Sequence, residues 1–387
     1  MKKTVYLDYQ ASKPVAPEVF EAMKPFFTDK YANASSLHTD GDMATDALED
    51  SRKTIAEFVN AENPREIIFT SGATESNNLA LIGFAMRNKR KGKHIIISEI
   101  EHISIHNIAK YLQKNGFEVS KVPVDFYGRI RIDKLKEKIR EDTILISVQY
   151  ANNEIGTIQP IAEIGEFARE KGIVFHTDAV AAESTVPIDV VRDKIDLLTL
   201  SSNDIYGPRG LGALYVRTGV MLTPIIIGGG QERGLRSGTE DIASIVGMAK
   251  AAEITQKLME AESKRLTELR TFLIKKVLEK IPKSYLNGHP KKRLPHNAHF
   301  RFDYIEGESL LLSLKDEGIA IATGSACTSK TLEPSHTLIS VGLLHEEAHG
   351  SLVVTLGRWT TREDIEKLIK VLPEIVERLR RLSPLAD

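Results

Sequence analysis

One cysteine and a series of short loops are the parts of this sequence that could do chemistry. Cys327 is the sole cysteine among 387 residues, and small polar residues surround it in the segment Gly324-Ser325-Ala326-Cys327-Thr328-Ser329. A thiolate is a good nucleophile and a soft metal ligand, whereas an inert core cysteine behaves as a small hydrophobic residue. The polar surroundings therefore favour a working thiol, and a lone cysteine excludes a disulfide within the chain.

Six short loops follow apolar, strand-like segments, and each contains residues that could contact a ligand. Ala73 and Thr74 lie in a loop of small and hydroxyl residues before a helix, where free backbone N–H groups can bind an anion. A plain Ser/Thr helix cap is the alternative for that loop. The other five loops supply an imidazole, side-chain amides, an acid, a tight turn and a glycine-dense basic stretch. In that order they contain His102, Asn152 and Asn153, Asp178, Gly207-Pro208-Arg209-Gly210, and residues 228–239.

The segments between these loops predict the elements that position them. Strand-like runs alternate with helical periodicity from about residue 15 to 230. Strands of almost unbroken apolar character, separated by helix-length segments, predict a mostly parallel sheet covered on both faces. Ligands bind such sheets beyond the carboxyl ends of the strands, where these loops lie. A long helical pattern over 242–281 then leads to a smaller C-terminal part that ends in an amphipathic helix over 362–382.

Composition and charge restrict the class of protein. The chain has 52 Lys and Arg residues against 53 Asp and Glu residues, whereas a dedicated nucleic-acid-binding protein needs a basic face. The N-terminus becomes polar before a signal-peptide core could form, and no apolar run reaches the ~18–20 residues of a membrane helix. A single cysteine fits a reducing compartment. We therefore expect a cytoplasmic protein with neither a membrane nor a nucleic acid as partner.

The order and spacing of the loops together resemble one known family. Over nearly its whole length the chain resembles the NifS/IscS cysteine desulfurases, which are class-V aminotransferases of pyridoxal phosphate (PLP) fold type I. The matching segments are Tyr6-Leu7-Asp8, Ser35-Ser36-Leu37-His38, Ser71-Gly72-Ala73-Thr74-Glu75-Ser76-Asn77-Asn78, Glu101-His102, Asn152-Asn153-Glu154-Ile155-Gly156, Tyr206-Gly207-Pro208-Arg209-Gly210, Gly324-Ser325-Ala326-Cys327, Glu333-Pro334-Ser335-His336 and Leu356-Gly357-Arg358.

The resemblance implies an aspartate-aminotransferase-like α/β fold. A large PLP-binding domain over residues 14–260 would contain a mostly parallel, seven-stranded sheet. Residues 1–13 and 261–387 would form a smaller α+β domain that carries the Cys327 loop. The long helical pattern over 242–281 is a plausible bridge between the two domains.

The resemblance also implies a homodimer that holds PLP in a cleft. The implied contacts are Ala73, Thr74, Ser201 and the partner subunit's Thr239 at the phosphate, His102 stacked on the ring, Asn153 at the ring hydroxyl and Asp178 at the ring nitrogen. An acid at the ring nitrogen keeps it protonated, so that the ring can accept electrons from the substrate. Cys327 would attack the sulfur of L-cysteine and pass it as a persulfide to an IscU-like iron–sulfur scaffold protein.

Four positions at the implied reaction centre depart from the family pattern. Asp204 stands where the family has the lysine that binds PLP covalently, and Asn203 stands where it has a histidine that contacts the phosphate. Ala181 replaces a glutamine at the ring hydroxyl, and Val353 replaces the arginine that binds the substrate carboxylate. A carboxylate cannot form an imine, and valine offers no charge to a substrate. Asn203 remains a candidate cofactor contact.

Two functions stay open from the sequence. The first is a PLP-dependent cysteine desulfurase that supplies sulfur for iron–sulfur cluster assembly. The second is a non-catalytic homologue in which Cys327 relays sulfur or ligates a [2Fe-2S] cluster shared with the scaffold protein. PLP would then be held without a covalent bond or be absent. An aminotransferase or a selenocysteine lyase is a weaker third hypothesis, because an aminotransferase needs the same missing lysine.

Overall fold

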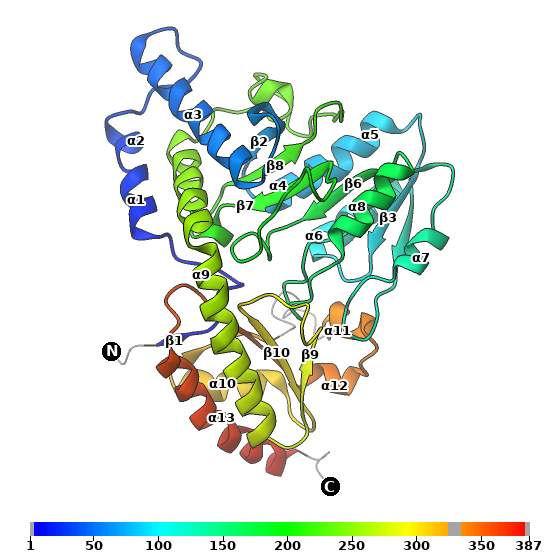
Figure 1. Ribbon diagram of the computed structural model, residues 1–387, viewed down its shortest axis with the longest axis vertical. Helices are drawn as coiled ribbons and strands as arrows, with labels where there is room; N and C mark the ends of the chain where they lie inside the picture. The colour runs from blue at the N-terminus through cyan, green and yellow to red at the C-terminus, as the bar shows by residue number, and fades with distance from the viewer. Residues whose placement is uncertain (1–3, 324–333, 384–387) are drawn as a thin grey trace.

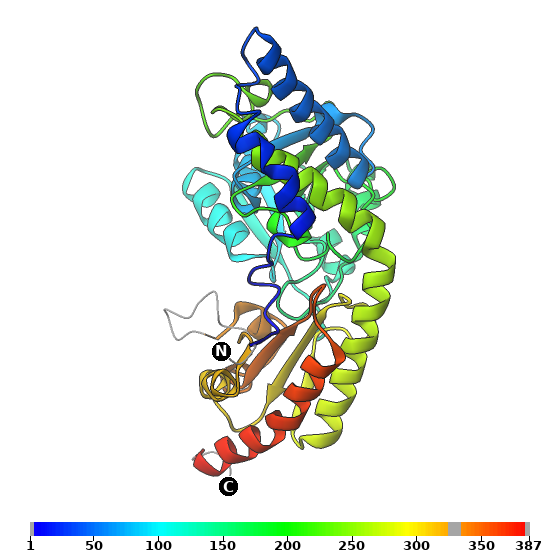
Figure 2. The same cartoon turned by 90° about the vertical axis from the view of Figure 1, so that its left-hand side faces the viewer.

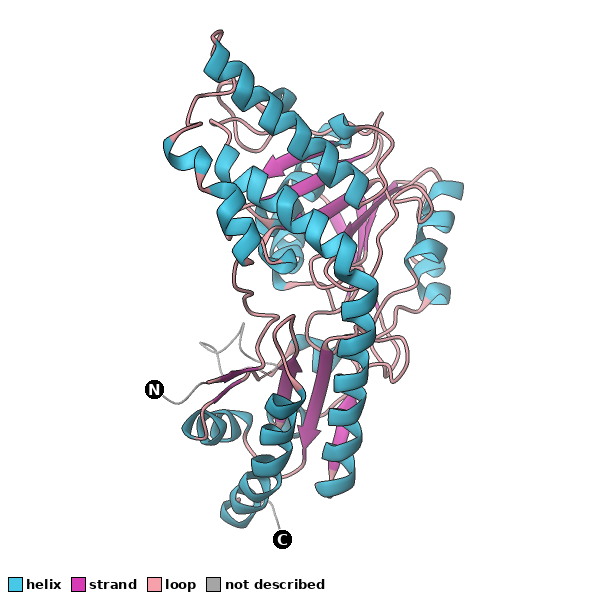
Figure 3. Cartoon of the chain, turned by 60° about the vertical axis from the view of Figure 1, so that its left-hand side comes forward, coloured by secondary structure: helices cyan, strands magenta, loops and turns pink. Residues whose placement is uncertain are grey.

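The structure is a computed structural model that describes residues 4–323 and 334–383 of the chain. Its described part forms two bodies, one around a seven-stranded sheet and one around a smaller antiparallel sheet (Figure 1). The long helix α9 (Ile242–Lys280) extends from the larger body along the smaller one (Figure 3). None of the helices in residues 4–323 and 334–383 is both long enough and apolar enough to cross a bilayer.

The large sheet has the strand order β2-β8-β7-β6-β5-β3-β4. Its strands are β2 (Ile67–Thr70), β3 (His94–Ser98), β4 (Glu118–Val122), β5 (Thr143–Ser147), β6 (Val174–Asp178), β7 (Leu197–Ser201) and β8 (Gly212–Val216). β3 to β7 pair in parallel, and β8 is antiparallel to both of its neighbours. The predicted α/β fold with a mostly parallel sheet of seven strands is confirmed.

Two apolar clusters cover the two faces of this sheet. Alternate strand residues face opposite sides, so Ile96 belongs to one cluster while Ile95 and Ile97 belong to the other. The first cluster includes side chains of α1 (Pro17–Met23), α3 (Thr39–Phe58), α8 (Ile161–Glu170) and α9. The second includes α5 (Phe84–Asn88) and α6 (Ile103–Lys114), together with the π-helical turn Leu79–Gly83 that joins α4 (Ala73–Asn78) to α5. Burial on both faces explains the unbroken apolar strands.

The smaller body has its own core. Three antiparallel strands, β9 (Ser284–Asn287), β10 (Asn297–Phe302) and β12 (Ser351–Thr355), lie beside α10 (Gly307–Asp316) and α13 (Arg362–Leu382). The N-terminal β1 (Val5–Tyr6) pairs in parallel with β11 (Ile319–Ala320), and Leu7 is buried in the same cluster. The remaining helices are α2 (Pro25–Thr28), α7 (Ile132–Glu137), α11 (His336–Ser340) and α12 (His345–His349). The domain limits near residues 13 and 260 stay a prediction.

Residues 7–16, which we call the crossing segment, run from the smaller body to the larger one (Figure 2). Near its start the backbone N–H of Gln10 donates to Thr355 Oγ1 of β12 at 2.9 Å. At its end the N–H of Ala16 donates to the carbonyl oxygen of Tyr206 at 2.9 Å. The segment therefore crosses the junction between the two bodies. The carboxyl ends of the parallel strands face this junction.

Candidate active site

A cavity of about 240 Å³ opens beyond the carboxyl ends of the parallel strands, and we call it the strand-end cavity. Five of the eight predicted cofactor contacts line it, namely Ala73, Thr74, His102, Asn153 and Asp178. The wall of the cavity also includes Asp204, Ala181 and the crossing-segment residues Gln10 and Ala11.

The phosphate end of this cavity is the N-terminus of α4. Gly72 is the N-cap residue, with φ at 139°, and it supplies no capping side chain. The first N–H groups of α4 have no partner within the helix, so those of Ala73 and Thr74 are oriented to bind an anion. The alternative of a plain Ser/Thr cap does not apply, because the N-cap residue is a glycine that tolerates this φ.

The ring end of the cavity has an oriented acid and an oriented imidazole. Asp178, at the end of β6, accepts hydrogen bonds from Asn77 Nδ2 at 2.8 Å and from the N–H of Val180 at 3.1 Å. His102 is the N-cap of α6, and its Nδ1 accepts from the N–H of Ser104 at 3.2 Å. Because Nδ1 is an acceptor, the neutral imidazole has its proton on Nε2. Both side chains are thus fixed before any ligand arrives.

Asp204 lies where the cavity would need an amine. It follows β7 in the short 3-10 turn Asn203–Ile205, and only 9% of its surface is exposed. Burial is the main cause that raises the pKa of Asp204 to about 6, and the charge of Asp178 raises it further. Lys13 and a hydrogen bond with Ser201 oppose this shift. Neither lysine nor arginine is among the described residues that line the cavity.

The other predicted contacts do not line the strand-end cavity in the described chain. Asn203 turns its amide toward the crossing segment, where Nδ2 donates to the carbonyl oxygen of Lys13 at 2.8 Å. Ser201 is buried at the end of β7, with its N–H donated to Glu183 Oε1 at 3.0 Å. Thr239 precedes α9, and its contact across a dimer stays a prediction. Cys327 lies outside the described residues.

A second cavity adjoins the first at the junction of the two bodies, and we call it the junction cavity. It shares Gln10, Ala11, His102 and Asn153 with the strand-end cavity. Val353, the position that the resemblance assigns to the substrate carboxylate, lies in its wall and is buried.

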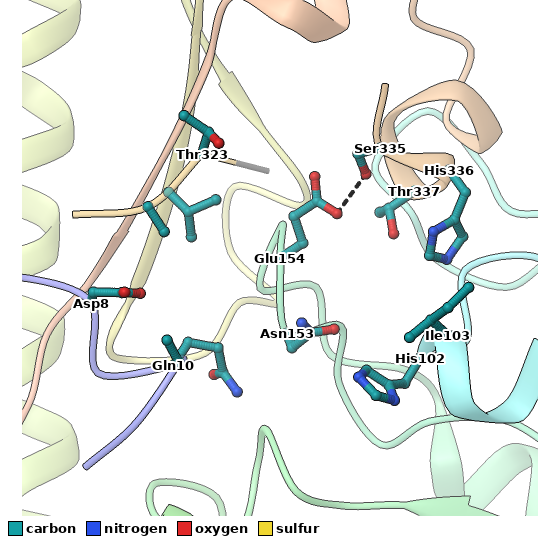
Figure 4. A pocket seen from close by; sticks show the side chains of 13 residues that line it. Asp8, Gln10, His102, Ile103, Asn153, Glu154, Thr323, Ser335, His336 and Thr337 are labelled. Carbon is teal, nitrogen blue, oxygen red and sulfur yellow. Dashed lines mark hydrogen bonds between the residues drawn. The ribbon is translucent and has the colours of Figure 1, made fainter. Parts of the chain in front are cut away.

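The charged groups of the junction cavity are acids. The carboxylates are Asp8 and Glu154, and Glu154 Oε2 accepts from Ser335 Oγ at 2.6 Å (Figure 4). No lysine or arginine belongs to the described part of its wall. A carboxylate that enters this cavity would meet two acids and a valine, and the imidazoles of His102 and His336 are the groups of the described wall that could take up a positive charge.

Comparisons with known proteins agree with this arrangement. A family model described as aminotransferase class-V matches residues 5–368. The protein named cysteine desulfurase IscS 1 of Archaeoglobus fulgidus is 58% identical over 380 residues, which cover 98% of this chain and 99% of that protein. The chain belongs to the cysteine desulfurase family.

Other members of the desulfurase family confirm the resemblance drawn from the motifs. The cysteine desulfurase IscS of Methanosarcina thermophila is 51% identical, covering 99% of this chain and 94% of that protein. A solved structure titled NifS-like protein superposes with a TM-score of 0.91 at 33% identity, covering 97% of this chain and all of that one. The fold, and PLP as the family's cofactor, follow from this membership.

The described residues of this desulfurase-family chain fit PLP in part. When bound, PLP supplies an aromatic ring that accepts electrons from an attached substrate. Ala73 and Thr74 can hold its phosphate, Asp178 its ring nitrogen and His102 its ring face. No described residue of the cavity wall offers an amine for covalent attachment, and the position to which the resemblance assigns the tether has the carboxyl group of Asp204.

Sequence reasoning missed three residues of this site. Asn77 lies within a matched motif, so its hydrogen bond to Asp178 could have been suspected from the sequence. Glu183 and Lys13 gave no such signal, since a charged side chain in a sequence is normally read as exposed. Both are buried beside Asp204 in the folded chain.

The junction cavity also predicts a pH dependence of stability. Burial raises the pKa of Asp8 to about 6, above the ordinary value of roughly 4 for an aspartate in an unfolded chain. Between pH 4 and 6 the folded state then binds more protons than the unfolded state, so stability falls as pH rises. The free energy of unfolding of Asp8→Asn, taken from thermal unfolding, should therefore rise relative to that of the parent between pH 4 and 6. The expected difference is on the order of 1 kcal/mol after solvent screening.

A matched control for this measurement is Asp50→Asn, at an exposed position of α3. Its melting temperature should stay parallel to that of the parent from pH 4 to 7. Parallel profiles for Asp8→Asn as well would show that the Asp8 carboxyl titrates normally, contrary to the prediction.

Proposed function

We propose that this protein handles sulfur for iron–sulfur cluster assembly through Cys327 and does not desulfurate free L-cysteine with covalently bound PLP. The observation that supports this most directly is the carboxyl group of Asp204 in the cavity where Asp178, His102 and Asn153 converge. In this proposal the protein is a cytoplasmic homodimer, and its partner is an IscU-like scaffold protein.

A few residues of the two cavities have a defined part in this proposal. Asp178, held by Asn77, and the N-terminus of α4 can still bind PLP without a covalent bond. Asp204 cannot form an imine with it and has no amine with which to move a proton at the substrate Cα. Val353 offers no charge to a substrate carboxylate, and no lysine or arginine lines the described part of the junction cavity. Binding of the coenzyme and its use in catalysis are therefore separate properties of this chain.

The sulfur transfer that remains needs only thiol chemistry. The Cys327 thiolate attacks the outer sulfur of a donor persulfide, the S–S bond breaks, and the donor leaves as a thiolate. A scaffold cysteine then repeats this exchange on the Cys327 persulfide. No net oxidation occurs in either step, and reactivity depends on the thiolate form of each cysteine. Ligation of a [2Fe-2S] cluster on the scaffold by the same thiolate is the alternative within this proposal.

A second candidate is a complete cysteine desulfurase. The observation that favours it is that five predicted ring and phosphate contacts line a single cavity, and that close relatives are named cysteine desulfurases. The two candidates differ in whether alanine is formed from free L-cysteine.

A cluster assembly assay tests the role of Cys327. The protein is mixed with an IscU-like scaffold, ferrous iron, cysteine persulfide and a thiol reductant, which supplies the electrons that reduce persulfide sulfur to sulfide. Cluster formation on the scaffold is followed by visible absorbance. We expect Cys327→Ser to lower the initial rate at least tenfold, toward the rate of the scaffold alone. The neighbouring Thr328→Ala and the cavity variant Asp204→Asn serve as controls and should retain the parent rate. A Cys327→Ser rate equal to that of the parent would contradict the proposal.

A further inference from the structure

Lys13 of the crossing segment is a buried lysine beside the altered tether position. Only 5% of its surface is exposed. Its Nζ donates to Ser184 Oγ at 2.9 Å and to the main-chain carbonyl oxygen of Asp204 at 2.5 Å, and lies 5.2 Å from the centre of the Tyr206 ring. Lysine is almost never buried to this extent without partners. The amine is therefore held in place, and it is not among the residues that line the strand-end cavity.

Two buried acids lie next to this amine. Asp204 and Glu183 are 9% and 0% exposed, and Glu183 Oε2 has no hydrogen-bond partner among the described residues. Burial raises the pKa of the Glu183 carboxyl well above its usual range, and Lys13 opposes that shift, as it does at Asp204. Carboxyl groups taken out of water need a compensating charge or must take up protons. Burial lowers the pKa of Lys13, and the charges of Asp204 and Glu183 oppose that shift, so the Lys13 side chain in its ammonium form supplies the compensating charge.

The main chain of Lys13 is held by the other altered residue. Asn203 Nδ2 donates to the carbonyl oxygen of Lys13 at 2.8 Å, and Asn203 Oδ1 accepts from its N–H at 3.3 Å. Asn203 and Asp204 thus both hold Lys13: the Asn203 side chain bonds to its main chain, and the main-chain carbonyl of Asp204 accepts from its amine.

We propose that Lys13 is a positioning residue: its amine offsets the charge of the buried Asp204 and Glu183 carboxyl groups and, with Asn203 and Asp204, it fixes the crossing segment as a wall of both cavities. Gln10 and Ala11 of that segment line the strand-end and junction cavities alike. This inference holds whether or not the proposed function is correct.

A double-mutant cycle of thermal unfolding tests the charge coupling between Lys13 and Asp204 on the full-length protein at pH 8. Lys13→Met should lower the melting temperature by roughly 5 °C or more, because it leaves buried acids without their cation. Asp204→Asn should lower it by less. The double variant should lose less than the sum of the two single losses. Lys257→Met, at an exposed position of α9, is the matched control and should change nothing. Additive losses in the cycle would overturn the proposal.

The coupling free energy between Lys13 and Asp204 should depend on pH, whereas a simple loss of packing would give the same value at every pH. The coupling should shrink as the pH falls below about 6, because Asp204 becomes protonated and then offers Lys13 no charge. The charged groups that face the pair are Asp178, Glu183, Glu262 and Arg358. A coupling that is the same at pH 8 and pH 5 would show that charge is not its cause.

Amide hydrogen exchange measures directly how firmly the crossing segment is held. In Lys13→Met, peptides that cover residues 7–16 should exchange several-fold faster, while peptides from α8 should be unchanged. If Lys13→Met does not fold, Asn203→Ala gives the same measurement, because it removes both hydrogen bonds to the main chain of Lys13 and leaves the amine intact. Unchanged exchange of residues 7–16 would overturn the proposal.

Discussion

The purified protein, mixed with PLP and L-cysteine, is expected to release alanine and sulfide no faster than PLP alone does. Positioned acid–base groups usually contribute ~10²–10⁴-fold to such a reaction, and Asp204 stands at the position to which the resemblance assigns the amine. In the junction cavity, to which the resemblance assigns the substrate carboxylate, the described wall includes Asp8, Glu154 and Val353 but no lysine or arginine. The measurement is alanine formed over time, with and without the protein.

Two variants make this result interpretable. Asp204→Asn and Cys327→Ser should give the same background as the parent, since neither group is then part of a turnover. Borohydride treatment with PLP should leave the protein without a pyridoxyl group in its mass spectrum. Turnover that disappears in Lys13→Met, or a pyridoxyl group on Lys13, would show that this lysine acts as a substitute tether, and the proposed function would then be wrong.

Restoring the amine at position 204 is expected to work only when Lys13 is changed as well. Asp204→Lys places a second ammonium group beside the buried Lys13, so we expect a less stable protein that binds PLP weakly. The double variant Asp204→Lys/Lys13→Met relieves this repulsion and leaves Glu183 as the counter-ion of the new amine. With PLP it should develop visible absorbance and, after borohydride, close to one pyridoxyl group per chain.

Lys13→Met alone is the control for that experiment and should remain colourless with PLP. Full labelling of Asp204→Lys, with a melting temperature equal to that of the parent, would mean that Lys13 is no obstacle to an amine at 204. Absence of a visible band in the double variant would place the obstacle at the remaining departures, Ala181 and Asn203.

Most of the large sheet could be predicted from the sequence, because most of its strands are buried on both faces and therefore contain runs of apolar residues. The same reasoning was less successful where other signals compete. The pattern over 18–27 predicts one helix, but the chain forms α1 and α2, divided where Pro25 lacks a backbone N–H. β1 and β11 have two residues each and pair across the whole chain, so no local pattern indicated them.

The candidate site was predictable to the extent that short motifs fix its residues. Ala73, Thr74 and Asp178 lie in loops after strands, and the topology brings such loops to one edge of the sheet. Lys13 could not be predicted, because its partner Asp204 is 191 residues away along the chain and no periodic pattern links the two. Charge pairs between distant segments become visible only when the fold places them together.

The pairing of β1 with β11 has a consequence for how this chain is made. Val5 is synthesised 319 − 5 = 314 residues before its partner Ile319. At a synthesis rate of ~5–20 residues per second, that interval is roughly 15–60 s. During this time the larger body can fold while β1 has no partner strand. The smaller body therefore closes only after β11 has been made.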